Sequence, residues 1–307
     1  MTSSAKHKRK PDWLRVKMGG GDTFHDIKRE LREKNLYTVC EEARCPNIGE
    51  CWRDGTATIM ILGDTCTRGC RFCNVKSGNP KGFLDRDEPQ KCAETVAAMN
   101  LNYVVITCVD RDDLPDGGAG QFARVIEAIR EARPKCLVEA LVSDYQGRKK
   151  DIALLADAAP DVFAHNVETV ERLTPKVRDP RASYRQSLDV LAYVKAHEPK
   201  RLTKSSIMLG LGETREEILQ TMADLRQAGV DVVTLGQYLK PSGKHLEVVE
   251  YITPEAFDEL GERAREMGFL YVASGPLVRS SYKAGEYFLA NHLAREQAYA
   301  LRGVFQV

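Results

Sequence analysis

Six cysteines, grouped in two triplets, are the residues of this sequence whose type and spacing indicate chemistry. In a chain of 307 residues with no visible secretory signal, an odd total of nine cysteines argues against a disulfide scaffold. Thiolates are soft ligands that select zinc, copper(I) or iron–sulfur clusters. The triplets therefore predict metal binding. The first triplet is Cys40, Cys45 and Cys51, and the second triplet is Cys66, Cys70 and Cys73.

The second triplet has three ligands on a loop short enough to enclose one metal centre. A closed structural zinc site needs four ligands. Three protein ligands on a four-iron cluster instead leave one iron open, and an open iron can bind a substrate or a cofactor. The spacing alone therefore leaves two alternatives: an iron–sulfur cluster with an open iron, or a zinc site completed by a distant histidine or cysteine. We expect the three scattered thiols to be buried and inert; they are Cys92, Cys108 and Cys136.

The composition excludes several classes of protein. Apolar residues make up 43% and charged residues 29% of the sequence, which is ordinary for a globular protein. No apolar run approaches the ~20 residues that span a bilayer. The net charge is +1, so the basic excess of a nucleic-acid-binding protein is missing. Residues 1–10 are polar and basic without an apolar core, so we expect a cytoplasmic protein without a secretory signal.

The chain beyond the triplets alternates between predicted strands and predicted helices. Six strand–helix units in a row imply parallel strands with helical crossovers, in a doubly wound sheet or in a full or partial barrel. A strand-like piece at 269–273 and a closing helix up to Ala300 follow. Strands are expected at 58–62, 103–107, 136–142, 161–167, 205–209 and 230–235, and helices at 90–100, 121–132, 152–158, 184–197, 215–228 and 254–267.

These elements place the second triplet at the carboxyl end of the first predicted strand. Parallel α/β folds carry their chemistry at that end of the sheet. No Rossmann glycine fingerprint follows this strand, and the sequence there reads CTRGCRFC. The first triplet follows a short amphipathic helix predicted at 24–37 and is expected on a loop.

The pattern Cys-x3-Cys-x-aromatic-Cys, with Phe72 as the aromatic residue, resembles the radical S-adenosylmethionine (SAM) enzymes. The resemblance implies a 4Fe–4S cluster on the second triplet and SAM bound to its open iron. It also implies cleavage of SAM to a 5′-deoxyadenosyl radical that abstracts hydrogen from an unreactive C–H bond. The implied fold is α/β, a partial (β/α)6 TIM-like barrel at 56–268, with an N-terminal extension at 1–55 and a C-terminal extension at 269–307.

The first triplet, in the sequence CEEARCPNIGECW, is similar to the auxiliary-cluster motif of the lipoyl synthase family. Two four-iron clusters normally use eight thiolates, and the triplets offer six, so each cluster lacks one ligand. SAM completes the radical cluster, and the resemblance assigns Ser281 to the auxiliary cluster, which is consumed as the sulfur donor. Cys108 stands where a smaller neutral residue is expected. Further similar stretches are RDDL at 111–114, HNVET at 165–169, LGLGET at 209–214 and GPLVRSSY at 275–282.

The resemblance implies insertion of sulfur at C6 and C8 of an octanoyl chain on a lysine of a lipoyl carrier protein or domain. Neither carbon is acidic, so a general base cannot break these C–H bonds. A radical generated from a cofactor is needed instead. The implied partners are the octanoylated carrier, an external electron donor and an iron–sulfur carrier that rebuilds the auxiliary cluster, with neither nucleic acid nor membrane. The alternatives are an enzyme like tRNA methylthiotransferase or biotin synthase, or a non-catalytic iron–sulfur or zinc protein.

Four further side chains are candidates for binding SAM: Phe72, Glu139, Asn166 and Lys204. Phe72 is expected near the adenine, with ordinary loop packing as the alternative. The three polar residues stand in or near predicted strands. They either bind the ribose and methionine groups of SAM or are buried polar groups whose hydrogen bonds are made within the core. Gly210 and Gly212 either let the backbone approach the cofactor or form a turn that precedes a helix capped by Thr214.

Overall fold

The computed structural model describes residues 9–15, 29, 31–34, 36–42, 45, 47–49 and 57–281. Most of the helix predicted at 24–37, the closing helix predicted up to Ala300 and the ligand candidate Cys51 lie outside the described residues.

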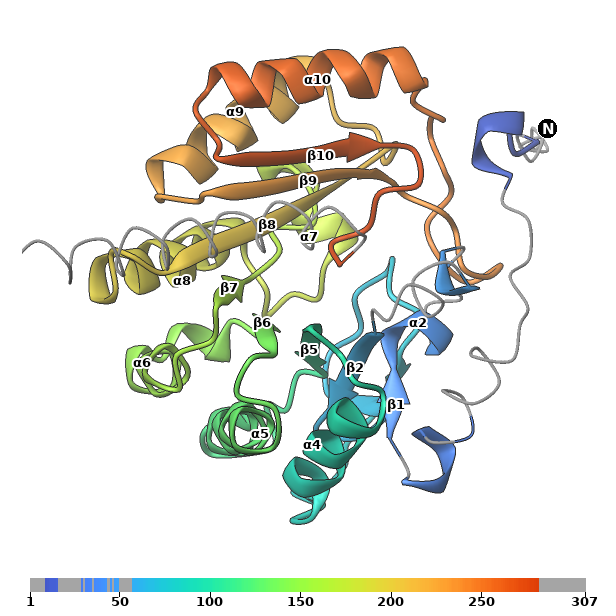
Figure 1. Cartoon of the computed structure of the whole chain (residues 1–307). Helices are drawn as coiled ribbons and strands as arrows, with labels where there is room; N and C mark the ends of the chain where they lie inside the picture. Colours follow the sequence, from blue (N-terminus) through green and yellow to red (C-terminus); the bar gives the residue numbers. More distant parts are fainter. Residues whose placement is uncertain are drawn as a thin grey trace, which may run out of the picture.

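Eight strands form the main sheet, in the order β1-β2-β5-β6-β7-β8-β9-β10 (Figure 1). Strand β1 pairs antiparallel with β2, and every later pair is parallel. Within the described residues, β1 and β10 are the two edges, so the sheet is an open, partial barrel, as the sequence predicts. The strands are Tyr37–Thr38 (β1), Ala57–Ile61 (β2), Tyr103–Cys108 (β5), Leu137–Leu141 (β6), Val162–Ala164 (β7), Leu202–Leu209 (β8), Val232–Gln237 (β9) and Tyr271–Gly275 (β10).

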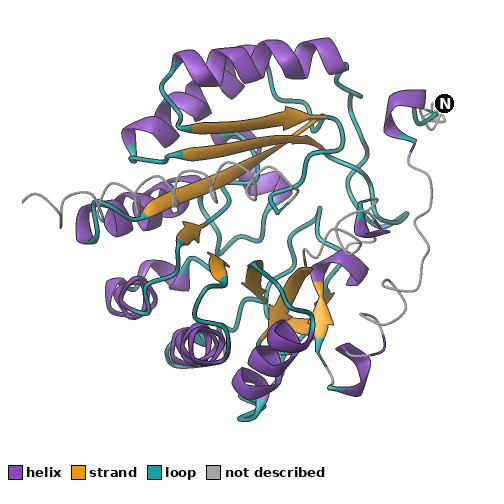
Figure 2. Cartoon of the chain, viewed as in Figure 1, coloured by secondary structure: helices purple, strands orange, loops and turns teal. Residues whose placement is uncertain are grey.

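Helices cover the outer face of the sheet (Figure 2). Thr214 caps α9 in a capping box with Glu217, since each side chain bonds the other's backbone N–H. This confirms the capping alternative for Thr214. None of the helices in the described part of the chain has the length and apolarity that a bilayer-spanning helix needs. The long helices are Glu88–Ala98 (α4), Ala119–Ala132 (α5), Lys149–Asp157 (α6), Tyr184–His197 (α8), Arg215–Gln227 (α9) and Pro254–Glu266 (α10).

Short elements complete the described chain. A second sheet of two parallel strands, β3 and β4, brackets the second triplet. Cys40 lies in α2, a single helical turn, where the sequence predicts a loop. These short elements are Asp12–Leu14 (η1), Val39–Glu42 (α2), Thr65–Cys66 (β3), Lys76–Ser77 (β4), Tyr145–Gly147 (η2), Glu171–Leu173 (η3) and Thr174–Val177 (α7).

Alternating side chains along each strand separate the barrel interior from the helix-covered face. In β5, Val104 and Ile106 pack in the core that α4 and α5 share. Tyr103 and Val105 belong instead to a separate interior cluster near the amino ends of the strands. The barrel interior is therefore layered, and its uppermost layer lies at the carboxyl ends of the strands.

Strand β10 lies in the segment at 269–307 that the resemblance assigns to a C-terminal extension. Strand β10 pairs in parallel with β9, with Tyr271 opposite Val232 and Gly275 opposite Gly236. The segment predicted to begin a C-terminal extension therefore continues the barrel sheet as far as residue 275.

Candidate active site

A cavity of about 520 Å³ lies at the carboxyl ends of the parallel strands. Segments from the whole chain reach it, from Lys10 near the N-terminus to Ser281 in the stretch that follows β10. Its volume lies in the range of about 300–1,000 Å³ that is typical of small-molecule sites. Five of the six triplet cysteines line it: Cys40, Cys45, Cys66, Cys70 and Cys73.

Backbone hydrogen bonds fasten the second triplet to neighbouring loops. Thr67 N donates to the carbonyl of Asp110 at 2.9 Å, which ties the loop to the end of β5. Gly69 N donates to Asp179 Oδ2 at 2.8 Å, and His245 Nε2 donates to the carbonyl of Cys73 at 2.9 Å. The loop is therefore held from three directions, by segments that follow β5, α7 and β9.

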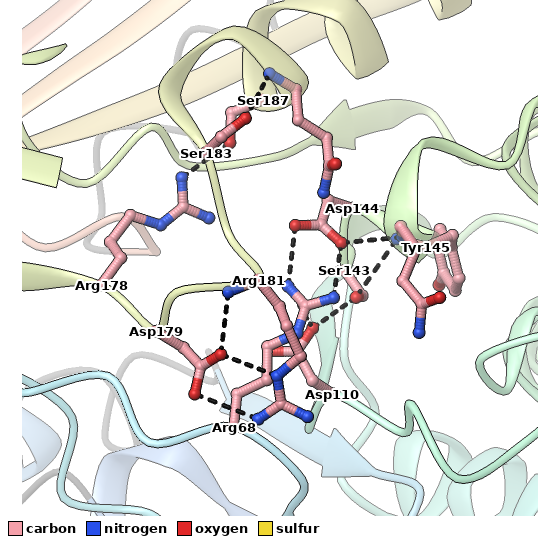
Figure 3. Close-up of polar contacts among 12 residues, drawn as sticks. Arg68, Asp110, Ser143, Asp144, Tyr145, Arg178, Asp179, Arg181, Ser183 and Ser187 are labelled. Carbon is pink, nitrogen blue, oxygen red and sulfur yellow. Dashed lines mark hydrogen bonds and ion pairs between the residues drawn. The ribbon is translucent and has the colours of Figure 1, made fainter. Parts of the chain in front are cut away.

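Arg68, inside this loop, anchors it through a buried ionic network (Figure 3). Its guanidinium makes two parallel hydrogen bonds of 2.7 Å to Asp144, and its Nε donates to Asp112 at 2.9 Å. Burial opposes ionisation of Asp144, but the hydrogen bonds from Arg68 outweigh it and lower the pKa of Asp144 to about 2. The pair is therefore charged at neutral pH and fixes the loop in one position.

Two sulfur atoms of the second triplet accept hydrogen bonds from backbone N–H groups. Arg68 N points at Cys66 Sγ at 3.4 Å, and Asp179 N points at Cys70 Sγ at 3.3 Å. Such N–H donors suit thiolates that bind iron. Burial, with Asp110 adding to it, raises the pKa of the Cys66 and Cys70 thiols to about 12. A metal must therefore replace the proton for these thiols to act as thiolates at neutral pH.

The three cysteines of the second triplet line one cavity together. A four-iron cluster takes each thiolate on a different iron, so a cluster with one open iron would fit this set of ligands.

Two of the four side chains expected to bind SAM line the cavity, and two do not. Phe72 and Asn166 are lining residues, and Asn166 Nδ2 donates to Glu168 Oε1 at 3.2 Å. Glu139 and Lys204 form a buried ion pair, with Lys204 Nζ 2.8 Å from both carboxylate oxygens. Tyr103 Oη also donates to Glu139.

Strand periodicity explains why the Glu139–Lys204 pair is not in the cavity. Both side chains point into the barrel, but Leu141 and Ser206, two residues further along each strand, are the ones that line the cavity. The pair lies one layer deeper. The structure thus places Glu139 and Lys204 outside the cavity lining, in the arrangement that the alternative of satisfied core polar groups describes.

Arg178 and Glu168 line the cavity and were not singled out from the sequence. Arg178 Nη1 donates to Ser187 Oγ at 2.7 Å, and among the described residues its Nε has no hydrogen-bond partner. Burial raises the pKa of Glu168. The HNVET stretch contains Glu168 and could have indicated it, whereas no local pattern indicates Arg178.

His165, which lines the cavity, takes part in a chain of hydrogen bonds. Its Nδ1 lies 2.8 Å from the carbonyl oxygen of Val142, so Nδ1 must be the protonated nitrogen. Its Nε2 then accepts from Ser187 Oγ at 2.9 Å, and Ser187 in turn accepts from Arg178. The neutral imidazole therefore has a partner for each of its ring nitrogens.

We expect His165 to make the free energy of unfolding fall as the pH is lowered from 6.5 toward 4. Burial and Arg178 lower the pKa of His165 from 6.5 to about 4. The unfolded chain therefore takes up this proton at a higher pH than the folded protein does, and acid favours unfolding by about 3 kcal/mol over that range. Urea unfolding at several pH values measures this loss. His165→Gln should remove it, and an equal pH dependence in that variant would contradict the assignment.

Two cysteines of the first triplet line the same cavity as Ser281. Cys40, Cys45 and Ser281 are all lining residues, whereas Cys51 lies outside the described residues. Burial raises the pKa of Cys45, and the nearby Arg279 guanidinium partly offsets that effect. The structure therefore brings both ends of the described chain to the place where the sequence predicts the auxiliary cluster.

Of the three scattered thiols, Cys92 and Cys136 are buried in the core that α4 and α5 share, as predicted. Cys108 differs, because it lies at the end of β5 and lines the cavity. Burial and the nearby Asp110 raise the pKa of Cys108 well above its usual range, so the thiol stays protonated at neutral pH. Cys108 is therefore only partly buried, and it lies at the site rather than in the core.

Two family models match this chain. The model described as the radical SAM superfamily matches residues 60–225. The model described as the N-terminal domain of lipoyl synthase of the radical SAM family matches residues 1–45. The two matches correspond to the parts of the chain that contribute the second triplet and the beginning of the first.

Curated proteins are similar over nearly the whole chain. The lipoyl synthase of Legionella pneumophila (strain Paris) is 56% identical over 294 residues, which are 95% of this chain and 89% of that protein. The mitochondrial lipoyl synthase of Schizosaccharomyces pombe is 58% identical over 290 residues, which are 93% of this chain and 78% of that protein.

Among solved structures, the FeFe-hydrogenase maturase HydG from Carboxydothermus hydrogenoformans is similar, with a TM-score of 0.57. The sequences are 12% identical, and the match covers 81% of this chain and 64% of that one. At such an identity the likeness concerns the fold.

Proposed function

Because this chain belongs to the lipoyl synthase family of the radical SAM superfamily, we propose that its cavity is where two sulfur atoms enter a protein-bound octanoyl chain. The activity is that of lipoyl synthase, a sulfurtransferase that acts at C6 and C8 with SAM and two 4Fe–4S clusters. This assignment replaces the methylthiotransferase, biotin synthase and non-catalytic alternatives. The observation that carries the placement is that cysteines of both triplets and Ser281 line one cavity.

The two cysteine triplets divide the work in this proposal. Cys66, Cys70 and Cys73 hold the cluster that, with SAM bound, supplies a 5′-deoxyadenosyl radical. The first triplet and Ser281 hold the cluster that supplies sulfur. Arg68 keeps the second triplet in position through its bonds to Asp144.

The chain's other side chains hold the two organic ligands and exclude water. Phe72 would face the adenine of SAM, and Asn166 with Glu168 would bind its ribose hydroxyls, since all three line the cavity. Apolar lining residues such as Leu141 and Met208 would surround the octanoyl chain. Exclusion of solvent matters because a carbon radical must meet the sulfur donor before any other hydrogen source.

Arg178 is proposed to bind the carboxylate of SAM. It is a buried cation that lines the cavity, its Nε lacks a partner among the described residues, and it lies close enough to influence the Cys70 thiol. A charged hydrogen bond of this kind contributes about 1.5–3 kcal/mol. We therefore expect Arg178→Gln to raise the KM for SAM about 10- to 100-fold in assays of 5′-deoxyadenosine formation.

The matched control is Arg185→Gln, which removes an arginine that pairs with Glu171 on the protein surface. Its KM for SAM should equal that of the unaltered protein. An unchanged KM in Arg178→Gln would rule out the carboxylate role.

The metal content tests the cluster assignment directly. We expect about eight irons per chain after anaerobic reconstitution, since two four-iron clusters are proposed. Iron and zinc analysis of the desalted protein measures it. Stoichiometric zinc with little iron would overturn the assignment.

The most informative assay of function supplies an octanoylated carrier domain, SAM and a reductant under anaerobic conditions. We expect mass analysis of the carrier to show two added sulfur atoms, and their absence under conditions that cleave SAM would contradict the proposal. The proposed partners are this carrier, an external electron donor and an iron–sulfur carrier that rebuilds the auxiliary cluster. We propose the cytoplasm as the location, and the division into an extension at 1–55, a barrel and a C-terminal extension remains part of the proposal.

A further inference from the structure

Gly236, in β9, lies against the backbone of the stretch that follows β10. A Cβ atom at Gly236 would lie 2.2 Å from the carbonyl oxygen and 3.1 Å from the carbonyl carbon of Val278. Both are backbone atoms, so no side-chain rotation relieves the contact, and the chain must shift to make room. Residues 277–281, the C-terminal segment, can therefore cross the end of β9 only because residue 236 has no side chain.

Hydrogen bonds hold the C-terminal segment at both ends. Asn47 Nδ2 donates to the carbonyl of Leu277 at 2.7 Å, and Thr58 Oγ1 donates to Ser281 Oγ at 3.0 Å. Both donors are buried: Asn47 is 2% exposed and Thr58 is 4% exposed. Asn47 lies between Cys45 and Cys51 in sequence, so the first contact ties the C-terminal segment to the first triplet itself.

These contacts deliver two side chains of the segment to the cavity. Arg279 Nη1 donates to the carbonyl of Val278 at 2.7 Å, and the guanidinium lies near Cys45. Ser281 Oγ accepts from Thr58 and keeps a second lone pair, since a hydroxyl oxygen has two. That lone pair is available to a metal while the bond from Thr58 stays in place. Figure 1 shows the chain after β10 turning back toward the middle of the molecule.

We propose that Gly236 and Thr58 are positioning residues for Ser281, and that together they decide whether the auxiliary cluster has its serine ligand. Gly236 sets how closely the C-terminal segment approaches the barrel, and Thr58 sets the position of the serine oxygen. Neither residue binds iron. The inference rests on the proposed role of Ser281 as a ligand, and the experiment below separates the two.

The test measures how fast a chelator removes iron from the protein carrying both clusters, with SAM in excess to protect the radical cluster. Mutation of a residue that orients a metal ligand typically lowers metal affinity or activity about 10- to 100-fold. We expect Gly236→Ala, Thr58→Val and Ser281→Ala each to release auxiliary iron about tenfold faster and to lower sulfur insertion about 100-fold. Formation of 5′-deoxyadenosine should change less than about twofold, because the second triplet keeps its contacts.

Two matched variants serve as controls. Gly243→Ala adds the same methyl group where no atom lies within 4 Å, and Thr58→Ser keeps the donating hydroxyl. Both should retain the iron and the sulfur insertion of the unaltered protein. Thermal unfolding of each variant shows that it is folded, and Thr58→Val still tests the inference if Gly236→Ala does not fold.

Two results would overturn the inference. If Ser281→Ala releases iron quickly while Gly236→Ala and Thr58→Val behave like their controls, the positioning role is wrong and the ligand role stands. If Ser281→Ala itself keeps its iron, both the positioning role and the proposed ligand role are wrong.

Discussion

Replacement of any one cysteine of the second triplet by alanine is expected to abolish 5′-deoxyadenosine formation. In the proposed arrangement each of these thiols takes one iron of a cluster whose open iron is left for SAM, so the loss of one thiol removes the site of cleavage. Replacement of Cys40 or Cys45 is expected to leave part of the cleavage activity and to eliminate sulfur transfer. Anaerobic assays that quantify 5′-deoxyadenosine and the sulfur content of the carrier measure both effects.

The structure gives this contrast its physical basis. The second triplet is held by contacts with Asp110, Asp179 and His245, whereas Cys40 lies in α2 and Cys45 follows it. Loss of a first-triplet thiol therefore leaves the contacts of the second triplet intact. Cys136→Ala, in the core outside the cavity, is the matched control and should keep both activities. Equal loss of both activities in both sets of variants would contradict the division of labour.

Removal of the lysine from the buried Glu139–Lys204 pair is expected to have the largest effect on stability. Lys204→Met leaves the Glu139 carboxylate buried without its charged partner, which costs about 3–5 kcal/mol. The double variant Glu139→Gln with Lys204→Met should recover most of this loss, because no unpaired charge remains and Tyr103 can still donate to the amide oxygen. Urea or guanidinium unfolding of the three proteins measures the differences.

The same variants separate a core role from a cofactor role. The double variant should show an unchanged KM for SAM, since neither side chain lines the cavity. A raised KM together with unaltered stability would restore the cofactor role and contradict the layered interior.

The order of strands and the cysteine triplets could be predicted because each has a local signal. Apolar runs at regular intervals predicted the seven parallel strands, and the short spacing of the second triplet predicted one shared site. Glu139 and Lys204 show the limit of such signals. Strand periodicity gives the face on which a side chain lies, but residues two apart share that face, so the depth within the barrel is undetermined.

Contacts between distant segments could not be predicted from the sequence. Arg68 pairs with Asp144, and no local pattern links a loop arginine to an acid that follows another strand. Arg178 gives no signal for the same reason. The importance of Gly236 could not be predicted either. Its missing side chain matters because the backbone of Val278, distant in sequence, lies against it.

The contacts of the C-terminal segment also bear on the order in which the two cysteine triplets acquire their surroundings during synthesis. Asn47 bonds residue 277, and Thr58 bonds residue 281, so the auxiliary site joins parts of the chain that are translated far apart in time. The loop of the second triplet reaches contacts with residues 110, 144 and 179 much earlier. Since chains are synthesised from the N-terminus and long loops close at an entropic cost, the first triplet acquires these contacts only after residues 277–281 have been made. The region of the second triplet can therefore fold before the region of the first triplet is complete.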